Sequence, residues 1–330
     1  MQLNGRILVT GAAGFTGGAL ARRLAADGHL VRGTARPGSD VRALEEAGIE
    51  VFFGDIADPN ATEEMMKGCS FVFHIAALFR RAGVPDAEYE RVNIEGTRLL
   101  LDAAAACGVT KFVHCSTIGV CGHIANPPAN EKTPYNPGDI YQQTKMEGEK
   151  LAISRFMDSR PQGVVVRPAS IYGPGDLRLL KMFKMISRRR FLVIGSGKPT
   201  FHVVYIDDLV EGFLLAMQKE VQTGETFIIA GNEYVPLNEL FRLVAEAVGA
   251  APPKWRVPVW PVQLLATLVE KVCIPFRIEP PIYRRRVDFF TKSRAFDISK
   301  AKHLLDYEPK VSLKEGMQRT ADWYRAEGLL

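Results

Sequence analysis

A glycine-rich turn between a strand and a helix constrains the fold of this chain more than any other feature. The apolar run Ile7-Leu8-Val9 leads into Thr10-Gly11-Ala12-Ala13-Gly14-Phe15-Thr16-Gly17, and a helical pattern follows. Gly11 permits a tight turn, Gly14 lets the backbone approach a pyrophosphate, and Gly17 lets the helix pack on the strand. The motif predicts a dinucleotide-binding unit; the alternative is a tight turn without a ligand. The residues expected to contact the dinucleotide are Gly11, Ala13, Gly14, Phe15, Thr16 and Gly17.

Short apolar runs alternate with helical patterns through the first half of the chain. Strands are expected at 6–9, 30–34, 50–53, 71–75, 111–115 and 163–167. Helices are expected at 17–26, 41–47, 62–67, 89–107 and 141–158. This alternation is typical of βαβ units in a parallel sheet. The sequence therefore predicts an α/β protein with a doubly wound parallel (Rossmann) sheet and helices on both faces.

The alternation loosens after Pro168, where prolines become frequent. An NAD(P)-binding domain is expected over 1–168, and a smaller, irregular region that mainly binds substrate over 169–330. Segments near 201–217 and 225–230 are expected to return to the first domain. The apolar stretch 257–276 holds three prolines and two charged residues, too interrupted to span a bilayer. A helix of the substrate region is expected there, with peripheral membrane contact as the alternative.

Composition and charge exclude several kinds of partner. The 330 residues are 47% hydrophobic and 24% charged, as in ordinary globular proteins, and the net charge is only +5. Because the basic residues are scattered except at 188–190 and 284–286, no nucleic-acid partner is expected. The five cysteines show neither a C-x-x-C pair nor metal-ligand spacing, so we expect reduced thiols and no metal. The start of the chain lacks a signal-peptide pattern, which favours a cytoplasmic protein.

The residue after the second expected strand bears on cofactor choice. NAD enzymes commonly place an acidic residue there to hold the ribose hydroxyls, whereas this chain has Ala35 and Arg36. A guanidinium binds a 2′-phosphate that an acid would repel, so Arg36 favours NADP over NAD. The alternative is an exposed surface arginine with NAD as the cofactor.

Two further patterns indicate proton-transfer chemistry. Tyr141 and Lys145 lie one turn apart on one face of a helix. An ammonium beside a phenol favours the phenolate, so Lys145 is expected to lower the Tyr141 pKa from about 10. Ser116 and Thr117 follow a strand, which places their hydroxyls at the carboxyl edge of the sheet. Each pattern alone is also typical of an exposed helical pair or of turn-forming hydroxyls.

Several short segments occur together in an order that marks one family. They are residues 10–17, Gly54-Asp55-Ile56, His74-Ile75-Ala76-Ala77, Asn93-Ile94-Glu95-Gly96-Thr97, Ser116-Thr117, Tyr141 to Lys145 and Arg167-Pro168. With this set the chain resembles, over essentially its whole length, the extended (atypical) short-chain dehydrogenases/reductases of the NAD-dependent epimerase/dehydratase superfamily. The resemblance implies an NAD(P)-dependent dehydrogenase or reductase with Thr117, Tyr141 and Lys145 as catalytic residues.

The resemblance also implies a role for each matching position. Thr117 is preferred to Ser116 because it lies five residues before Gly122, where the family carries its catalytic hydroxyl. Asn93 is implied as a further catalytic residue that kinks a helix or relays a proton; turn and cap chemistry is the alternative for Asn93 and Asp55. The further cofactor contacts implied are Asp55 and Ile56 at the adenine, Ala76 and Ala77 near a ribose, Ser116, Tyr141 and Lys145, and Pro168 beside the nicotinamide.

The later segments are most similar to the branch with 3β-hydroxysteroid dehydrogenases and dihydroflavonol reductases. We therefore expect hydride transfer on an apolar secondary alcohol or ketone. The family resemblance, with apolar residues at helical spacing in helices 89–107 and 141–158, also implies a homodimer formed through these two helices. The residues expected to line the substrate site are Phe79, Cys121, Ile171, Phe201 and His202. One alternative is a nucleotide-sugar epimerase or dehydratase with Arg178, Arg188 or the Arg284 cluster on the phosphates. The other is a non-catalytic NADP-binding regulatory protein.

Overall fold

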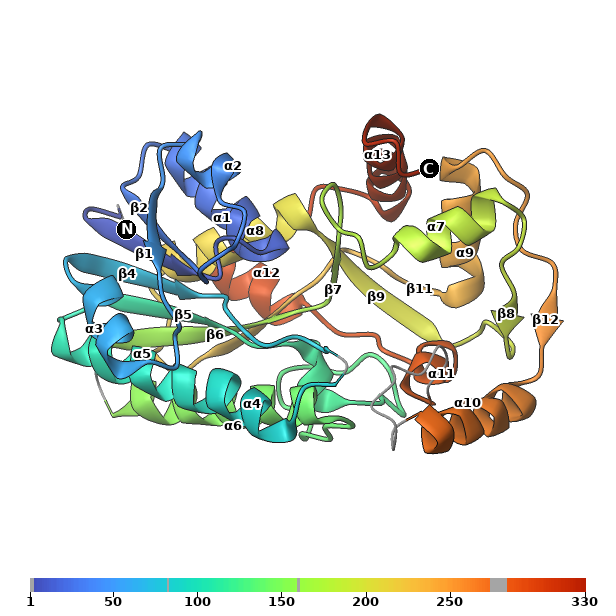
Figure 1. The fold of residues 1–330 in the computed structure, drawn as a ribbon, viewed down its shortest axis with the longest axis horizontal. Helices are drawn as coiled ribbons and strands as arrows, with labels where there is room; N and C mark the ends of the chain where they lie inside the picture. Colours follow the sequence, from blue (N-terminus) through green and yellow to red (C-terminus); the bar gives the residue numbers. More distant parts are fainter. Residues whose placement is uncertain (1–2, 82, 159–160, 274–283) are drawn as a thin grey trace.

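The fold is built on a seven-stranded sheet in which every neighbouring pair of strands is parallel. The computed structural model describes residues 3–81, 83–158, 161–273 and 284–330. The strand order is β10-β6-β5-β4-β1-β2-β3 (Figure 1). The strands are β1 (Arg6–Thr10), β2 (Val31–Ala35), β3 (Glu50–Phe53), β4 (Cys69–His74), β5 (Lys111–Cys115), β6 (Gln162–Pro168) and β10 (Thr226–Ile229). The predicted doubly wound sheet is thereby confirmed.

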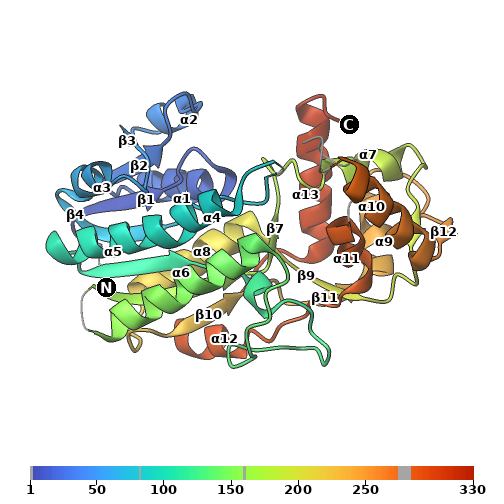
Figure 2. The same cartoon turned by 60° about the horizontal axis from the view of Figure 1, so that its bottom comes forward.

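Alternate residues along each central strand point to opposite faces of this sheet, and both faces are buried. Leu8, Val72 and Phe112 pack in one apolar cluster, under helices α3 (Pro59–Met66), α5 (Gly96–Ala106) and α6 (Ile140–Met157). Their neighbours Val9, Phe73 and Val113 pack in the other, with α1 (Phe15–Ala26) and α8 (Ile206–Gln218). Helices therefore cover both faces, which explains why these strands are apolar without alternation (Figure 2).

The helix expected over 89–107 is interrupted near its start. It consists of α4 (Asp86–Glu90), one π-helical turn over Arg91–Glu95, and α5. Asn93 lies in the π turn, and α6 crosses it so closely that a Cβ on Gly148 would lie 2.6 Å from the Asn93 carbonyl oxygen. Single π turns inside helices often mark functional sites. Two short helices complete this half, α2 (Arg42–Glu45) and the 3₁₀ turn η2 (Ile118–Cys121).

The C-terminal region lies beside the carboxyl end of the large sheet (Figure 1). It contains a three-stranded sheet of β7 (Ser170–Tyr172), β9 (Thr200–Tyr205) and β11 (Tyr234–Pro236), and a pair formed by β8 (Val193–Ile194) and β12 (Arg256–Val257). Its helices are α7 (Leu180–Ser187), α9 (Leu237–Ala247), α10 (Val259–Cys273), α11 (Arg284–Thr291) and α13 (Leu313–Ala326), while α12 (Ser299–Leu305) packs beside β10.

The segment expected to return to the first domain over 201–217 divides between the two regions. Strand β9 pairs with β7 and β11 in the small sheet, whereas α8 packs against α1 and the large sheet. The segment near 225–230 supplies β10, which pairs with β6 from Thr226 opposite Val165 to Ile229 opposite Pro168. The chain therefore crosses between the regions more than once, because the sheet of the first domain is completed only by β10.

Helix α10 occupies most of the apolar stretch 257–276, whose last three residues lie outside the described residues. Its side chains Trp260, Leu264, Leu265 and Leu268 are exposed. Among the described residues, no helix has both the length and the apolar character needed to cross a membrane. All five cysteines are described, and all are free thiols.

Candidate active site

A cavity of about 820 Å³ opens at the carboxyl ends of the large sheet, facing the C-terminal region. The structure brings many of the residues that the sequence singled out to its walls. From the expected cofactor and catalytic sets these are Gly11, Ala13, Gly14, Phe15, Thr16, Gly17, Arg36, Asp55, Ile56, Ala76, Ala77, Ser116, Thr117, Tyr141 and Pro168. From the expected substrate set they are Phe79, Ile171 and Phe201.

The glycine-rich turn forms one end of this cavity. Gly11 has a φ of +71°, and a Cβ on Gly17 would lie 2.3 Å from the Gly11 carbonyl oxygen, so neither position tolerates a side chain. The Gly11 amide donates to Thr34 Oγ1 at 3.1 Å, which ties the turn to β2. No side chain caps the N-terminus of α1 and its first turn holds no acidic residue, so its amides face the cavity free for an anion. This cradle fits the pyrophosphate of a dinucleotide.

The next part of the wall carries Arg36 and Asp55. Arg36 is exposed at the end of β2. The Asp55 carboxylate accepts from the Ala57 amide at 2.9 Å and from Arg91 Nη2 at 2.8 Å. These contacts, aided by Arg36, lower the Asp55 pKa although burial opposes the shift. Asp55 therefore lines the cavity and also holds the turn after β3 in place. The second role is the turn chemistry that the sequence offered as the alternative for Asp55.

Tyr141 lies in the first turn of α6, half-buried in the cavity wall. Asp139 caps this helix by accepting from the Gln142 amide at 2.9 Å, and the Phe79 ring packs edge-on against Tyr141 at 5.0 Å between centroids. Thr117 lines the same cavity, and its Oγ1 accepts from the Gly119 amide at 3.1 Å. The Thr117 hydroxyl hydrogen stays available to a ligand.

The Lys145 side chain points away from the cavity, whereas the sequence predicted an ammonium beside the Tyr141 phenol. It is buried, it is not among the lining residues, and its Nζ donates to the Cys115 carbonyl oxygen at 2.6 Å. Burial raises the pKa of Tyr141, Cys115 and Asp139 raise it further, and the cations that oppose the shift are Arg80 and Arg178. The structure therefore does not show the lowering of the Tyr141 pKa by Lys145 that the helical spacing predicted. Lys145 instead holds the end of β5, which positions Ser116 and Thr117.

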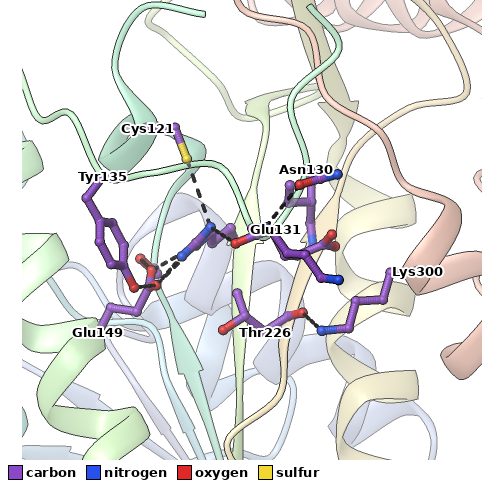
Figure 3. A network of polar contacts seen from close by, with 11 residues as sticks. Cys121, Asn130, Glu131, Tyr135, Glu149, Thr226 and Lys300 are labelled. Carbon is purple, nitrogen blue, oxygen red and sulfur yellow. Dashed lines mark hydrogen bonds and ion pairs between the residues drawn. The ribbon is translucent and has the colours of Figure 1, made fainter.

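Behind the cavity wall, a buried polar network begins at Ser116. The Ser116 hydroxyl donates to Glu149, which also accepts from Tyr135 at 2.7 Å and from Arg167 at 2.5 Å. Arg167 further donates to the Glu131 carbonyl oxygen at 3.3 Å. Figure 3 shows Tyr135 and Glu149 facing each other, with Glu131 nearby. The Ser116 hydroxyl is thus occupied while that of Thr117 faces the cavity, which agrees with the choice of Thr117.

Besides Lys145, three residues of the expected site do not line the cavity. The Asn93 amide oxygen accepts from the Leu78 amide at 2.8 Å and its nitrogen donates to Thr144 at 3.0 Å, so Asn93 holds the loop before Phe79 against α6. His202 is bonded to the Gly231 carbonyl oxygen at 2.8 Å. Cys121 is buried beside Arg167. The polar atoms of Asn93 and His202 are thus hydrogen-bonded within the protein, and the roles expected of Asn93, Cys121 and His202 stay predictions.

Sequence reasoning missed several residues at this site. Glu149 was detectable, because it lies one further turn along the Tyr141 and Lys145 face of α6. Arg80 and Arg294 also line the cavity, with Phe289 beside them. Their positions follow from no local pattern, since the loop after β4 and the segment after α11 meet only in the folded chain.

The structure combines a doubly wound sheet, a glycine-rich cradle at the strand ends and a helix with Tyr141 and Lys145 beside that cradle. This combination defines the NAD(P)-dependent enzymes of the extended short-chain dehydrogenase/reductase type. The present enzyme belongs to the NAD dependent epimerase/dehydratase family, whose model it matches over residues 7–230.

Relatives and solved structures agree with this membership. Sterol demethylase protein B of Methylococcus capsulatus is 30% identical, over 98% of this chain and 99% of its own. The 3 beta-hydroxysteroid dehydrogenase/Delta 5-->4-isomerase of Mycobacterium tuberculosis is also 30% identical, over 97% of this chain and 90% of its own. The solved UDP-glucose 4-epimerase of Thermotoga maritima superposes with a TM-score of 0.80 at 26% identity, covering 98% of this chain and 99% of that one.

Proposed function

We propose that this enzyme interconverts a secondary alcohol and a ketone on an apolar substrate. The observation that carries the proposal is the apolar wall around Tyr141. Phe79 packs on the tyrosine ring, and Phe201 packs on Phe289 at 5.1 Å across the substrate end of the same cavity. Aromatic walls of this kind bind an apolar body and leave few polar groups to orient it. Two 30% identical relatives, one named a sterol demethylase protein and the other a 3 beta-hydroxysteroid dehydrogenase, support this substrate class.

The proposed chemistry assigns one task to each polar group. Thr117 donates a hydrogen bond to the substrate oxygen, and Tyr141 exchanges a proton with it. Lys145 fixes the end of β5 that carries Thr117. When bound, a nicotinamide dinucleotide supplies the hydride acceptor or donor, so oxidation of the alcohol yields one hydride to it and one proton to the chain. Because burial raises the Tyr141 pKa, the phenol is protonated at neutral pH and ready to donate to a ketone.

The second candidate function is a nucleotide-sugar epimerase or dehydratase. The similarity to the UDP-glucose 4-epimerase and the presence of Arg178 in the cavity favour it. However, Arg178 is already bonded to Asp176 at 2.6 Å and to the Ile171 carbonyl oxygen at 2.8 Å. Arg188 is exposed and does not line the cavity, and the side chains of Arg284, Arg285 and Arg286 lie outside the described residues.

One screen separates the two functions. The purified protein is mixed with NADP or NADPH and a panel of hydroxysteroids, flavonoid-like ketones and nucleotide sugars, and nicotinamide absorbance is followed. An alcohol dehydrogenase or ketone reductase changes this absorbance in proportion to product. An epimerase converts a sugar into its epimer with no net change in absorbance. If sugar conversion without an absorbance change were the only reaction seen with any compound of the panel, the proposed function would be rejected.

NADP as the preferred cofactor is part of the proposal. If Arg36 binds a 2′-phosphate, NADP(H) should bind about 10- to 100-fold more tightly than NAD(H), since one charge-assisted contact contributes roughly 1.5–3 kcal/mol. Arg36→Ala should remove most of that difference when dissociation constants are measured by fluorescence titration. Arg42→Ala is the matched control, because Arg42 is exposed, pairs with Asp40 at 2.7 Å and does not line the cavity. Equal affinities in the unmodified protein would contradict the assignment.

A homodimer and a cytoplasmic location complete the proposal. The dimer would pair α5 and α6 with their symmetry mates, as the family resemblance implies. Sedimentation velocity should then give the mass of two chains at micromolar concentration; the mass of one chain at every concentration would count against it.

A further inference from the structure

One arginine side chain lies between the glycine-rich cradle and Tyr141. The Arg178 guanidinium is 5.6 Å from the centroid of the Phe15 ring and 5.9 Å from the centroid of the Phe79 ring. Phe15 is the first residue of α1, at the cradle, whereas Phe79 packs on Tyr141. All four residues line the same cavity. Arg178 therefore places a positive charge between the cradle and the tyrosine that exchanges the proton.

The loop that carries Arg178 is held against the start of α1. The Tyr324 hydroxyl, on α13, donates to the Asp176 carbonyl oxygen at 2.5 Å, which ties the loop to the C-terminal region. A Cβ on Gly175 would lie 3.2 Å from Cδ2 of Phe15, and the φ of Gly175 is +95°, so a side chain there would be both crowded and strained. The loop thus reaches from the C-terminal region to the cradle.

Two of the three guanidinium nitrogens of Arg178 are bonded within the protein. Nε donates to Asp176 at 2.6 Å, and Nη2 donates to the Ile171 carbonyl oxygen at 2.8 Å. Within the described part of the chain, Nη1 has neither a hydrogen bond nor an ion pair. The Arg178 side chain is 43% exposed and that of Asp176 only 2%, so the accessible group of this pair is the cation. The two bonds fix the guanidinium and leave Nη1 for one charge-assisted contact.

The cradle beside Arg178 suits an anion, but its own donors are backbone amides. No side chain caps α1, and its first turn holds no acidic residue. A pyrophosphate carries two negative charges, whereas the N-terminus of a helix is equivalent to roughly half a positive charge. A guanidinium next to these amides would supply the missing charge, because it binds phosphate oxygens through charge-assisted hydrogen bonds.

The strand order indicates which phosphate lies nearer to Arg178. In the large sheet, β4 and β5 lie on one side of β1, and β2 and β3 lie on the other. Asp55 follows β3, whereas Phe79 follows β4 and packs on Tyr141. A dinucleotide that crosses the strand ends with its nicotinamide at Tyr141 therefore has its nicotinamide-side phosphate toward Phe79. Arg178 lies on that side of the cradle, since its guanidinium is over the Phe79 ring as well as the Phe15 ring.

We propose that Arg178 binds the dinucleotide through the phosphate on its nicotinamide side. Nη1 donates to a phosphate oxygen, while Nε and Nη2 keep their bonds to Asp176 and to the Ile171 carbonyl oxygen. The loop of the C-terminal region thereby contributes to cofactor affinity, in addition to the glycine-rich turn. The inference goes beyond the proposed function, because it rests on dinucleotide binding by the family and not on the identity of the substrate.

Calorimetry with three probes tests this contact. The probes are NADPH and two adenosine 2′-phosphates, one with a 5′-diphosphate and one with a 5′-monophosphate, so that only the monophosphate lacks the second phosphate. NADH, ADP and AMP replace them if NADH binds more tightly than NADPH. Arg178→Met keeps the apolar stem of the side chain and removes its charge. We expect it to weaken the dinucleotide and the diphosphate by about 10- to 100-fold, the usual contribution of hydrogen bonds to a charged group, and to leave the monophosphate unchanged.

Two further variants locate the effect. Arg178→Lys keeps the charge and should retain part of the affinity for the dinucleotide and the diphosphate. Arg188→Met is the matched control and should change no affinity, because Arg188 is exposed and does not line the cavity. The far-UV circular dichroism spectrum, together with the unchanged affinity for the monophosphate, reports that each variant is folded.

The outcomes separate this contact from the proposed function. Unchanged affinity of Arg178→Met for the dinucleotide would overturn the contact. Equal weakening of the diphosphate and the monophosphate would also overturn it, because a contact to the second phosphate cannot act on a probe without one. If Arg178→Met weakened UDP-glucose and left the dinucleotide unaffected, Arg178 would belong to the substrate site of the epimerase alternative. Each readout is a binding affinity, so failure of the alcohol and ketone screen leaves the contact standing, and failure of the contact leaves the oxidoreductase function standing.

Discussion

Tyr141→Phe is expected to lower kcat by about 10² to 10⁴-fold, the usual contribution of general acid–base catalysis, and to leave dinucleotide affinity nearly unchanged. Phenylalanine keeps the ring that packs against Phe79 at 5.0 Å and removes the proton that Tyr141 exchanges. The measurement is turnover on the best substrate of the panel, together with the dissociation constant of NADPH. Near-normal turnover would show that the proton follows another path.

The other residues of the site give graded controls. Thr117→Ser keeps the hydroxyl and should be tolerated, whereas Thr117→Val should not. Lys145→Met should impair both cofactor binding and rate, because Nζ holds the Cys115 carbonyl oxygen at the end of β5. Tyr234→Phe is the matched control, since Tyr234 is exposed on β11 and does not line the cavity.

The raised Tyr141 pKa gives this prediction a pH signature. Burial favours the neutral phenol, so the proton donor for ketone reduction is present through neutral pH and is lost only under alkaline conditions. The reduction rate should therefore stay level through neutral pH, and the oxidation rate should rise with pH as the phenolate becomes available. Both features should disappear in Tyr141→Phe if Tyr141 is the titrating group.

Glu149→Ala is expected to cause the largest loss of stability of any change at the site. Glu149 is fully buried and accepts hydrogen bonds from Ser116, Tyr135 and Arg167. Without it, the Arg167 charge remains buried and unpaired, which typically costs about 3–5 kcal/mol. For 330 residues this corresponds to a melting temperature lower by about 4–7 °C, given roughly 2.1 cal/mol/K of unfolding entropy per residue.

A control on the same helix isolates the cause. Glu147 is only partly buried and pairs with Lys150 at 3.4 Å, so Glu147→Ala should change the free energy of unfolding by less than about 1 kcal/mol. The double variant Glu149→Leu with Arg167→Met should recover part of the lost stability, because it removes both buried charges together. A melting temperature of Glu149→Ala equal to that of Glu147→Ala would contradict the importance of the pair.

The sequence alone was sufficient to predict the fold, and the residues that it assigned to the glycine-rich turn line one cavity of the structure. The central strands are apolar because both of their faces are buried, and the expected strands at 50–53 and 111–115 match β3 and β5 residue for residue. The glycine-rich turn and the Tyr141 helix are local patterns too, since each depends on residues within a few turns of one another. Such local features do not depend on how distant segments pack together, so they can be predicted from residue spacing.

The tertiary structure decided what lies between segments distant in the chain. Spacing placed Lys145 and Tyr141 on one helix face, but the ammonium bonds to Cys115, thirty residues away, because a strand-end carbonyl is within reach there. The same holds for Arg80 and Arg294, which the fold brings to one cavity from the first and last parts of the chain. Asn93 lies in a π turn that α6 crosses closely at Gly148, a contact that no helical periodicity encodes. Periodicity thus determined the sheet and the cradle, whereas the partners of the charged side chains depended on how the loops packed around them.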